Sequence, residues 1–301
     1  MFVATSIGCG PMINVIQILG TTFCGSTALS YMLGNHEDSV TVGELYSIFK
    51  RKNCRCISCN TKIENCKLCK SIKESNVDDV YRVVSEFTGK DFIIDSSKFP
   101  AWYEKLNGDY YNKTKIFLYK NPIRFAASCV KHRVRSVSFG VTVGKDERII
   151  DNVPIWSKSL EYAINVFKRN IPRLLGLNPI VIIYEDFAKE PENTVKRICD
   201  MSGFPYRDGM HRFWENTHHH NIGGNIGANY FMNDIYKIGS DSIYKDNYKE
   251  IFVDNSYKRY LNDDDIKLLC ENEDIVDTVN AVSKYTGVSF DKLMFGEYYE
   301  E

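Results

Sequence analysis

Residues 15–33, VIQILGTTFCGSTALSYML, join an apolar run, a glycine-containing turn and a run of helix-compatible residues. The apolar, β-branched run at 15–19 is typical of a buried strand, and it stops at Gly20. From Ser26 to Leu33 the residues are compatible with a helix. The stretch therefore predicts a strand, a tight loop and a helix in succession, and we expect the rest of the chain to be organised around them.

The loop between this strand and helix has the form G-x-x-x-x-G-S-T. This is the spacing of a phosphate-binding P-loop, except that Ser26 stands in the lysine position. Glycines let the backbone aim its N–H groups inward, and the helix adds the positive end of its dipole. The pattern predicts an anion site, with an ordinary strand-to-helix connection as the alternative. The residues expected to contact the anion are Thr21, Thr22, Phe23, Cys24, Gly25, Ser26 and Thr27.

The missing lysine argues against a nucleoside triphosphatase, in which it holds the β- and γ-phosphates against a metal ion. A phosphosulfate carries less charge, so backbone amides, hydroxyls and one lysine from elsewhere could hold it. The loop resembles that of the sulfotransferase family, whose donor is 3′-phosphoadenosine 5′-phosphosulfate (PAPS). The resemblance is to bacterial-type members, which are related to the tyrosylprotein and carbohydrate sulfotransferases.

A second anion site is predicted after the apolar run at 115–119. Lys120, Arg124 and Ser128 follow at spacings of four, so Arg124 and Ser128 share one face of a helix that starts at Pro122, with Lys120 just ahead. A solvated basic helix face is the alternative. The segment resembles the sulfotransferase motif for the nucleotide's 3′-phosphate. Its first position is Lys120 instead of arginine, which keeps the charge but loses the bidentate fork.

Lys98 and Glu44 are the candidates for the chemistry. Lys98 follows the predicted strand 92–94 and three polar residues, and the carboxyl ends of strands are where open α/β sheets bind ligands. Resemblance to the tyrosylprotein-type enzymes implies that Lys98 touches the transferring sulfuryl group and that Glu44 is the general base. Phe23 stands where those enzymes hold a basic residue, so Lys98 or another cation must supply more charge. His36 is the reserve candidate for the base.

The cysteines are unevenly distributed along the chain. Five of the ten fall between Cys54 and Cys69, and they include two Cys-x-x-Cys pairs. Such pairs can direct thiolates at a tetrahedral zinc ion, which would order a segment with few apolar residues. The predicted ligands are Cys56, Cys59, Cys66 and Cys69. Cys54 is a fifth cysteine in the same stretch, so the identity of one ligand stays open. A loop of reduced thiols or an adventitious disulfide is the alternative. Many bacterial sulfotransferase-like sequences carry a similar Cys-containing insert, which implies a structural role.

Three adjacent histidines, at 218–220, also invite a metal interpretation. They cannot converge on one ion from a regular helix or strand, so we expect a polar loop at the active site. Related sulfotransferases often have an arginine after the following Gly-Asn, and this chain has Ile226-Gly227-Ala228 there. That donor contact is therefore lost, or another residue such as Lys237 makes it.

Composition bounds the remaining possibilities. The 301 residues are 44% hydrophobic, enough for one large core, and we expect a single domain over 1–301 with a small cysteine-rich insert at about 50–75. The formal net charge is −1 and no basic run stands out, which argues against nucleic acid as a partner. No signal-peptide pattern or membrane-spanning run is present, so we expect a cytoplasmic protein.

Further elements follow the same alternation of strand and helix. Apolar runs predict strands at 92–94, 115–119 and 179–184, amphipathic spacing predicts helices at 77–88, 157–175 and 264–285, and 131–156 is expected to be a loop. The pattern predicts an α/β protein with a P-loop-like, three-layer fold and a mostly parallel central sheet flanked by helices.

The predicted function is transfer of a sulfuryl group from PAPS to a hydroxyl. The acceptor, which the sequence does not identify, would be a small metabolite, a sugar or a peptide tyrosine. The alternatives are a P-loop nucleotide kinase and a nucleotide-binding protein with little or no turnover. Ser26 argues against the first, and Phe23 and Ala228 keep the second open. The oligomeric state is also open.

Overall fold

The structure, a computed structural model, describes residues 12–51, 54–106, 111–137, 149–150, 153–215, 219–225, 228–229, 249–253 and 255–296. Its strands are β1 (Ile13–Gly20), β2 (Ser39–Gly43), β3 (Arg55–Cys56), β4 (Thr61–Lys62), β5 (Phe92–Lys98), β6 (Tyr111–Tyr119), β7 (Ile149–Ile150), β8 (Val153–Pro154) and β9 (Ile180–Ile183). Its helices are α1 (Ser26–Leu33), α2 (Ser47–Lys50), α3 (Lys67–Glu74), α4 (Val80–Thr88), α5 (Pro100–Tyr103), α6 (Pro122–Val137), α7 (Ile155–Leu175), α8 (Tyr184–Lys189), α9 (Pro191–Ser202), α12 (Tyr257–Tyr260), α13 (Asp263–Glu271), α14 (Glu273–Thr286) and α15 (Phe290–Phe295).

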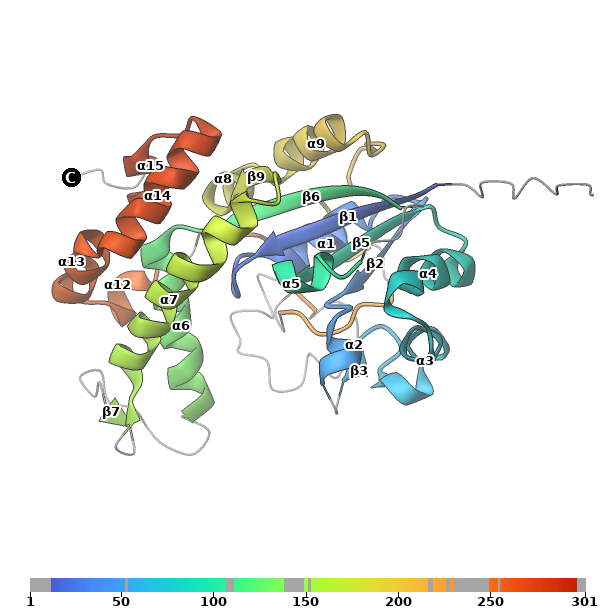
Figure 1. Cartoon of the computed structure of the whole chain (residues 1–301), viewed down its shortest axis with the longest axis horizontal. Helices are drawn as coiled ribbons and strands as arrows, with labels where there is room; N and C mark the ends of the chain where they lie inside the picture. Colours follow the sequence, from blue (N-terminus) through green and yellow to red (C-terminus); the bar gives the residue numbers. More distant parts are fainter. Residues whose placement is uncertain are drawn as a thin grey trace, which may run out of the picture. The chain divides into compact units, whose positions relative to one another are not determined.

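The main sheet has five strands in the order β2-β5-β1-β6-β9 (Figure 1). β2 pairs with β5 in parallel, and β6 pairs with β9 in parallel. Neighbouring strands that are not consecutive in the chain are joined by helical crossovers, as parallel pairing requires. The chain is therefore an α/β protein with a mostly parallel central sheet flanked by helices, which confirms the predicted fold class.

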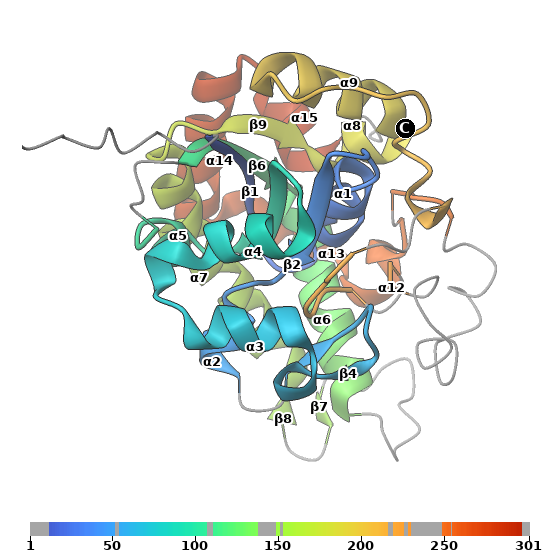
Figure 2. The same cartoon turned by 90° about the vertical axis from the view of Figure 1, so that its right-hand side faces the viewer.

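Packing divides the chain into two compact units. The first takes in the described residues of 1–18, 27–114 and 195–249, and the second those of 19–26, 115–194 and 250–301. In the first unit, α3 packs beside α4 (Figure 2). In the second, α7 packs against both α6 and α14 (Figure 1). The predicted anion-binding loop and the predicted 3′-phosphate segment both belong to the second unit, except for Thr27.

The strand, loop and helix of 15–33 form as predicted. β1 is buried along nearly its whole length, as expected for a strand covered on both faces, and it extends the predicted run by two residues before and one after. The helix that follows begins at Ser26 and ends at Leu33, as the sequence indicated. Within the described residues, no helix is both long and apolar enough to cross a membrane.

Three predicted boundaries are wrong. β5 continues past residue 94 to Lys98, because its polar residues are buried in a hydrogen-bond network around Asp95. The expected loop at 131–156 is helical up to Val137, where α6 packs along α7, and residues 138–148 and 151–152 lie outside the described part. The expected helix at 264–285 is two helices. They are separated at Asn272, whose side chain accepts a hydrogen bond from the Ile275 N–H and caps α14.

Candidate functional site

The loop between β1 and α1 has a backbone conformation that requires glycine at position 25. Gly25 has φ +87°, and a Cβ there would lie 2.6 Å from Cε2 of Tyr184. Phe23 also lies in the left-handed region, with φ +62°, which is uncommon for a bulky residue. Backbone strain of this kind costs of the order of 1–3 kcal/mol and persists where the surroundings impose it. The loop is therefore a preformed turn.

Two hydroxyls in this loop suit an anion. Thr21 is buried and Thr22 is half-buried, and the Oγ1 atoms of both are shielded from solvent without a hydrogen-bond partner among the described residues. A buried hydroxyl without a partner costs about 1–3 kcal/mol, which a ligand oxygen would recover. The loop, followed by the N-terminus of α1, fits the phosphate end of a nucleotide.

Lys120 joins the loop to the second predicted anion segment. Its Nζ donates to the carbonyl oxygen of Phe23 at 3.2 Å and to Oγ of Ser128 at 3.1 Å. The same ammonium lies 4.9 Å from the centre of the Tyr184 ring. All four residues belong to the second unit, so the two segments predicted from separate motifs meet there. Lys120 therefore places a cation beside the loop, a position for which the sequence had suggested Lys98 or another cation.

Arg124 is buried in the first turn of α6. Its Nη2 donates to Oδ1 of Asn255 at 2.9 Å, its Nη1 donates to the carbonyl oxygen of Phe295 at 3.3 Å, and its guanidinium lies over the Tyr257 ring. Arg124 and Ser128 line a small pocket with Ala127, Lys131, Ser256, Tyr257 and Tyr260. The pocket is cationic and rich in hydroxyls, which suits a phosphate monoester.

A buried carboxyl lies near these cations. Glu185 accepts a hydrogen bond from the N–H of Asn121 at 3.3 Å. Burial raises the pKa of the Glu185 carboxyl, and the nearby charge of Lys120 acts in the opposite direction. Nothing in the sequence pattern pointed to Glu185 as a neighbour of the predicted anion site.

Glu44 and Lys98 form a close ion pair in the first unit. Nζ of Lys98 donates to Oε1 of Glu44 at 2.5 Å, and both side chains are largely buried. Nη2 of Arg51, which is largely exposed, lies 3.4 Å from Oε2 of the same carboxylate. Lys98 has φ +69°, so its side chain reaches Glu44 from a strained backbone at the end of β5. Glu44 and Lys98 were predicted separately, and the structure brings them together.

Asp95 anchors the backbone that carries Lys98. Its Oδ1 accepts from the Ser97 N–H at 2.8 Å, and its Oδ2 accepts from the Tyr81 hydroxyl at 2.8 Å and from Nε1 of Trp102 at 2.9 Å. Burial raises the pKa of the Asp95 carboxyl even though these donors favour its charged form. The network fixes the end of β5 and therefore the position from which Lys98 extends.

The segment 219–225 runs past both Glu44 and the start of α1. The Glu44 N–H donates to the carbonyl oxygen of Ile222 at 2.7 Å, and a Cβ at Gly223 would lie 3.0 Å from Oε2 of Glu44. Oγ1 of Thr27 accepts from the Asn225 N–H at 3.0 Å. His36, the reserve base, instead accepts from the Asp38 N–H at 3.1 Å, which fits a local cap. His218, Ile226, Gly227 and Lys237 lie outside the described residues.

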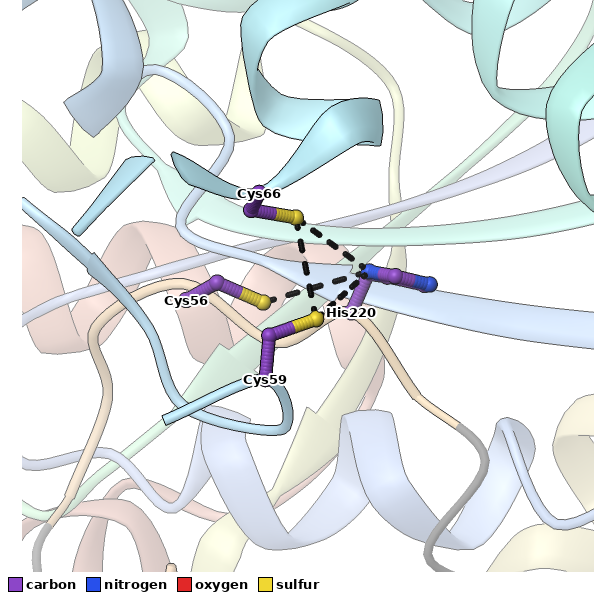
Figure 3. Close-up of side chains that lie close together, drawn as sticks. All are labelled: Cys56, Cys59, Cys66 and His220. Carbon is purple, nitrogen blue, oxygen red and sulfur yellow. Dashed lines mark hydrogen bonds between the residues drawn. The ribbon is translucent and has the colours of Figure 1, made fainter. Parts of the chain in front are cut away.

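Three of the four predicted zinc ligands gather with a residue that was not predicted. Cys56, Cys59 and Cys66 have their sulfurs beside Nδ1 of His220 (Figure 3). The predicted fourth ligand, Cys69, lies beside Cys56 and Cys66, and their thiols raise its pKa. Cys54 donates to the carbonyl oxygen of Ser47 and is not one of the four grouped residues. The His218–His220 run was the available signal for His220, but it was assigned to a loop without metal.

The fold and this geometry define an α/β protein with a glycine-containing loop at the end of its first strand and a buried carboxylate–lysine pair. No protein-family model matches the chain, and neither does any curated protein. Solved structures that resemble it include two sulfotransferase domains. One is the sulfotransferase domain from the Synechococcus PCC 7002 olefin synthase, with a TM-score of 0.45 and 14% identity over 85% of this chain and 92% of that one. Another is the sulfotransferase domain from the curacin biosynthetic pathway, with a TM-score of 0.47 and 16% identity over 91% of this chain and 99% of that one.

Proposed function

We propose that the protein transfers a sulfuryl group from PAPS to a hydroxyl acceptor. The observation that carries the proposal is the position of Lys120, whose ammonium contacts both the Phe23 carbonyl in the loop and Ser128 on α6. The two motifs that resemble donor-binding motifs are thus adjacent in one unit. In the proposal, Thr21, Thr22 and the loop amides hold the 5′-phosphosulfate, and Lys120, Arg124 and Ser128 hold the 3′-phosphate.

Glu44 and Lys98 take the catalytic roles in this proposal. The acceptor hydroxyl oxygen forms a bond to sulfur as the bond between sulfur and the 5′-phosphate oxygen breaks, which leaves 3′-phosphoadenosine 5′-phosphate. The hydroxyl proton passes to the Glu44 carboxylate, and the Lys98 ammonium stabilises negative charge on the bridging oxygen. Their ion pair at 2.5 Å holds the carboxylate in one orientation before the acceptor binds.

The acceptor class in this proposal is a hydroxyl compound, either a small molecule, a sugar or a peptide tyrosine. A structural zinc ion in the cysteine-rich segment is a further part of the proposal. The ion would order residues 54–69, which contain few apolar side chains, and would have no direct part in the transfer.

The test is a transfer assay with sulfur-labelled PAPS and a panel of hydroxyl acceptors, run beside a phosphoryl-transfer assay with ATP and Mg²⁺. Labelled product that appears only with PAPS supports the proposal. Phosphoryl transfer from ATP would point to a kinase instead. Tight binding of 3′-phosphoadenosine 5′-phosphate without transfer to any acceptor would point to a binding protein.

The variant Glu44→Gln tests the proposed base. Loss of a positioned base lowers rates by about 10²- to 10⁴-fold, so we expect the transfer rate to fall by that factor while the Kd for 3′-phosphoadenosine 5′-phosphate is unchanged. Asp38→Asn, at an exposed carboxylate in the same unit, is the matched control and should keep the wild-type rate. A Glu44→Gln variant with full turnover would contradict the assignment.

A further inference from the structure

Four possible ligand atoms lie close together in the first unit. Sγ of Cys59 is 3.7 Å from Sγ of Cys66, and Nδ1 of His220 is 3.9, 3.7 and 3.7 Å from the sulfurs of Cys56, Cys59 and Cys66 respectively. All four atoms lie within 4.8 Å of one another. Figure 3 shows the three thiols and the imidazole pointing toward a common centre.

These separations match the edges of a zinc tetrahedron. With Zn–S bonds of about 2.3 Å and a Zn–N bond of about 2.0–2.1 Å, tetrahedral geometry puts sulfurs about 3.8 Å apart and sulfur about 3.6 Å from nitrogen. Single pairs of thiols also pack at 3.7–3.9 Å, so the argument rests on four donor atoms gathering around one point. The donor set also suits zinc, which prefers cysteine and histidine.

Cys69 competes with His220 for the fourth position. Two Cys-x-x-Cys pairs indicate a four-cysteine site in the sequence, and Cys69 does lie beside Cys56 and Cys66. Its sulfur nevertheless does not belong to the group in which every donor atom lies within 4.8 Å of every other, whereas His220 Nδ1 does. The geometry therefore favours three cysteines and one histidine, with Cys69 next to the ligands.

We propose that a zinc ion binds to Cys56, Cys59, Cys66 and His220, and that through His220 the ion ties the cysteine-rich segment to the segment 219–225 that lies against Glu44.

Backbone contacts next to His220 show which segments of the chain the ion would hold together. The Ile57 N–H donates to the carbonyl oxygen of Asn221 at 2.8 Å, and the Asn221 N–H donates to Oγ of Ser58 at 3.3 Å. Ile222 forms isolated bridges with both Cys56 and Gly43. The cysteine-rich segment and the strand that leads to Glu44 therefore share one backbone partner.

The proposed ion would also restrict the residues that surround the Glu44 carboxylate. The carbonyl oxygen of Ile222 accepts a hydrogen bond from the Glu44 N–H, and a Cβ at Gly223 would lie 3.0 Å from Oε2 of Glu44, so the carboxylate would have to shift to accommodate a side chain there. A metal ion that fixes His220 therefore also fixes the two residues that border Glu44. The inference concerns metal content and local order, so its test is independent of whether the chain transfers sulfuryl groups.

The direct test is X-ray absorption at the zinc edge on the wild-type protein purified with its metal. We expect about one zinc ion per chain, with three sulfurs at about 2.3 Å and one nitrogen at about 2.0–2.1 Å. A shell of four sulfurs would overturn the assignment of His220. A preparation that folds fully without zinc and takes up none would overturn the site.

Variants separate the two candidate ligands. We expect His220→Ala to lose most of its zinc, as measured by elemental analysis after dialysis, and Cys69→Ser to keep it. The reverse result would make Cys69 the ligand and would contradict the proposal. Circular dichroism of each variant shows whether it is folded.

Hydrogen exchange tests the proposed tie and guards against a folding failure. In His220→Ala we expect faster exchange at the amides of Glu44 and Ile222, while the amides of residues 116–119 in β6 and of β9, which belong to the second unit, stay protected as in the wild type. Unchanged exchange at Glu44 and Ile222 in a zinc-free His220→Ala protein would overturn the tie. If His220→Ala does not fold, the same comparison is made on wild-type protein before and after a chelator removes the zinc.

Discussion

Asp95 shows how one buried residue can fix a site without belonging to it. It receives four hydrogen bonds: two from Ser97, one from Tyr81 and one from Trp102. An asparagine there would have to turn its NH₂ group either toward the Ser97 N–H or toward Nε1 of Trp102, and neither of these groups can accept a hydrogen bond. We therefore expect Asp95→Asn to lower the free energy of unfolding by about 1–3 kcal/mol, measured by urea denaturation.

The pH dependence of that loss follows from the raised pKa of Asp95. Because burial raises the pKa of Asp95 above the usual aspartate value of 3.8, this group's contribution to stability is fully present below that value and is lost as the pH rises through the folded-state pKa. The stability advantage of the wild type over Asp95→Asn should therefore be larger at about pH 4 than at about pH 7. An advantage that grows with pH would mean that the buried carboxylate is more stable charged than neutral.

At the scale of the element, the loop between β1 and α1 depends on Gly25. In Gly25→Ala the new Cβ would lie 2.6 Å from the Tyr184 ring, so either the ring or the loop must move. We expect binding of 3′-phosphoadenosine 5′-phosphate to weaken at least about tenfold, which corresponds to about 1.4 kcal/mol. Isothermal titration calorimetry measures this loss.

Gly203→Ala is the matched control for the loop. Gly203 also has a positive φ, +69°, but a Cβ there would meet nothing within 4 Å. Both variants carry the backbone strain of alanine at positive φ, of the order of 1–3 kcal/mol, and only Gly25→Ala should lose nucleotide affinity. Equal affinities in the two variants would show that the loop does not hold the nucleotide.

For the whole molecule, local patterns predicted the fold well. The strand, loop and helix of 15–33 and the parallel pairing follow from apolar runs of strand length alternating with helical spacing, which the burial of the sheet imposes on the sequence. The run at 92–94 underestimated β5 because Asp95 looks like the end of a strand. Only its long-range partners Tyr81 and Trp102 make it suitable for burial.

The candidate site was less predictable, because its contacts join distant parts of the chain. The spacing of Lys120 and Ser128 was visible, but the contact of Lys120 with Phe23, 97 residues away, was not. His220 lies 164 residues from Cys56, and a run of three histidines gives no sign of which one faces a distant cysteine. The strained backbone of Lys98, at φ +69°, likewise has no signature in the residue type.

The central claim is that the loop and Lys120 hold one bisphosphorylated adenosine. Its most direct test is a calorimetric cycle with two ligands, 3′-phosphoadenosine 5′-phosphate and 5′-AMP, and two proteins, the wild type and Lys120→Met. A charge-assisted hydrogen bond contributes about 1.5–3 kcal/mol, so the wild type should prefer the 3′-phosphorylated ligand by at least about 10- to 150-fold, and Lys120→Met should reduce that preference by about the same factor. A wild type that binds the two ligands equally, or a variant that keeps the full preference, would contradict the account.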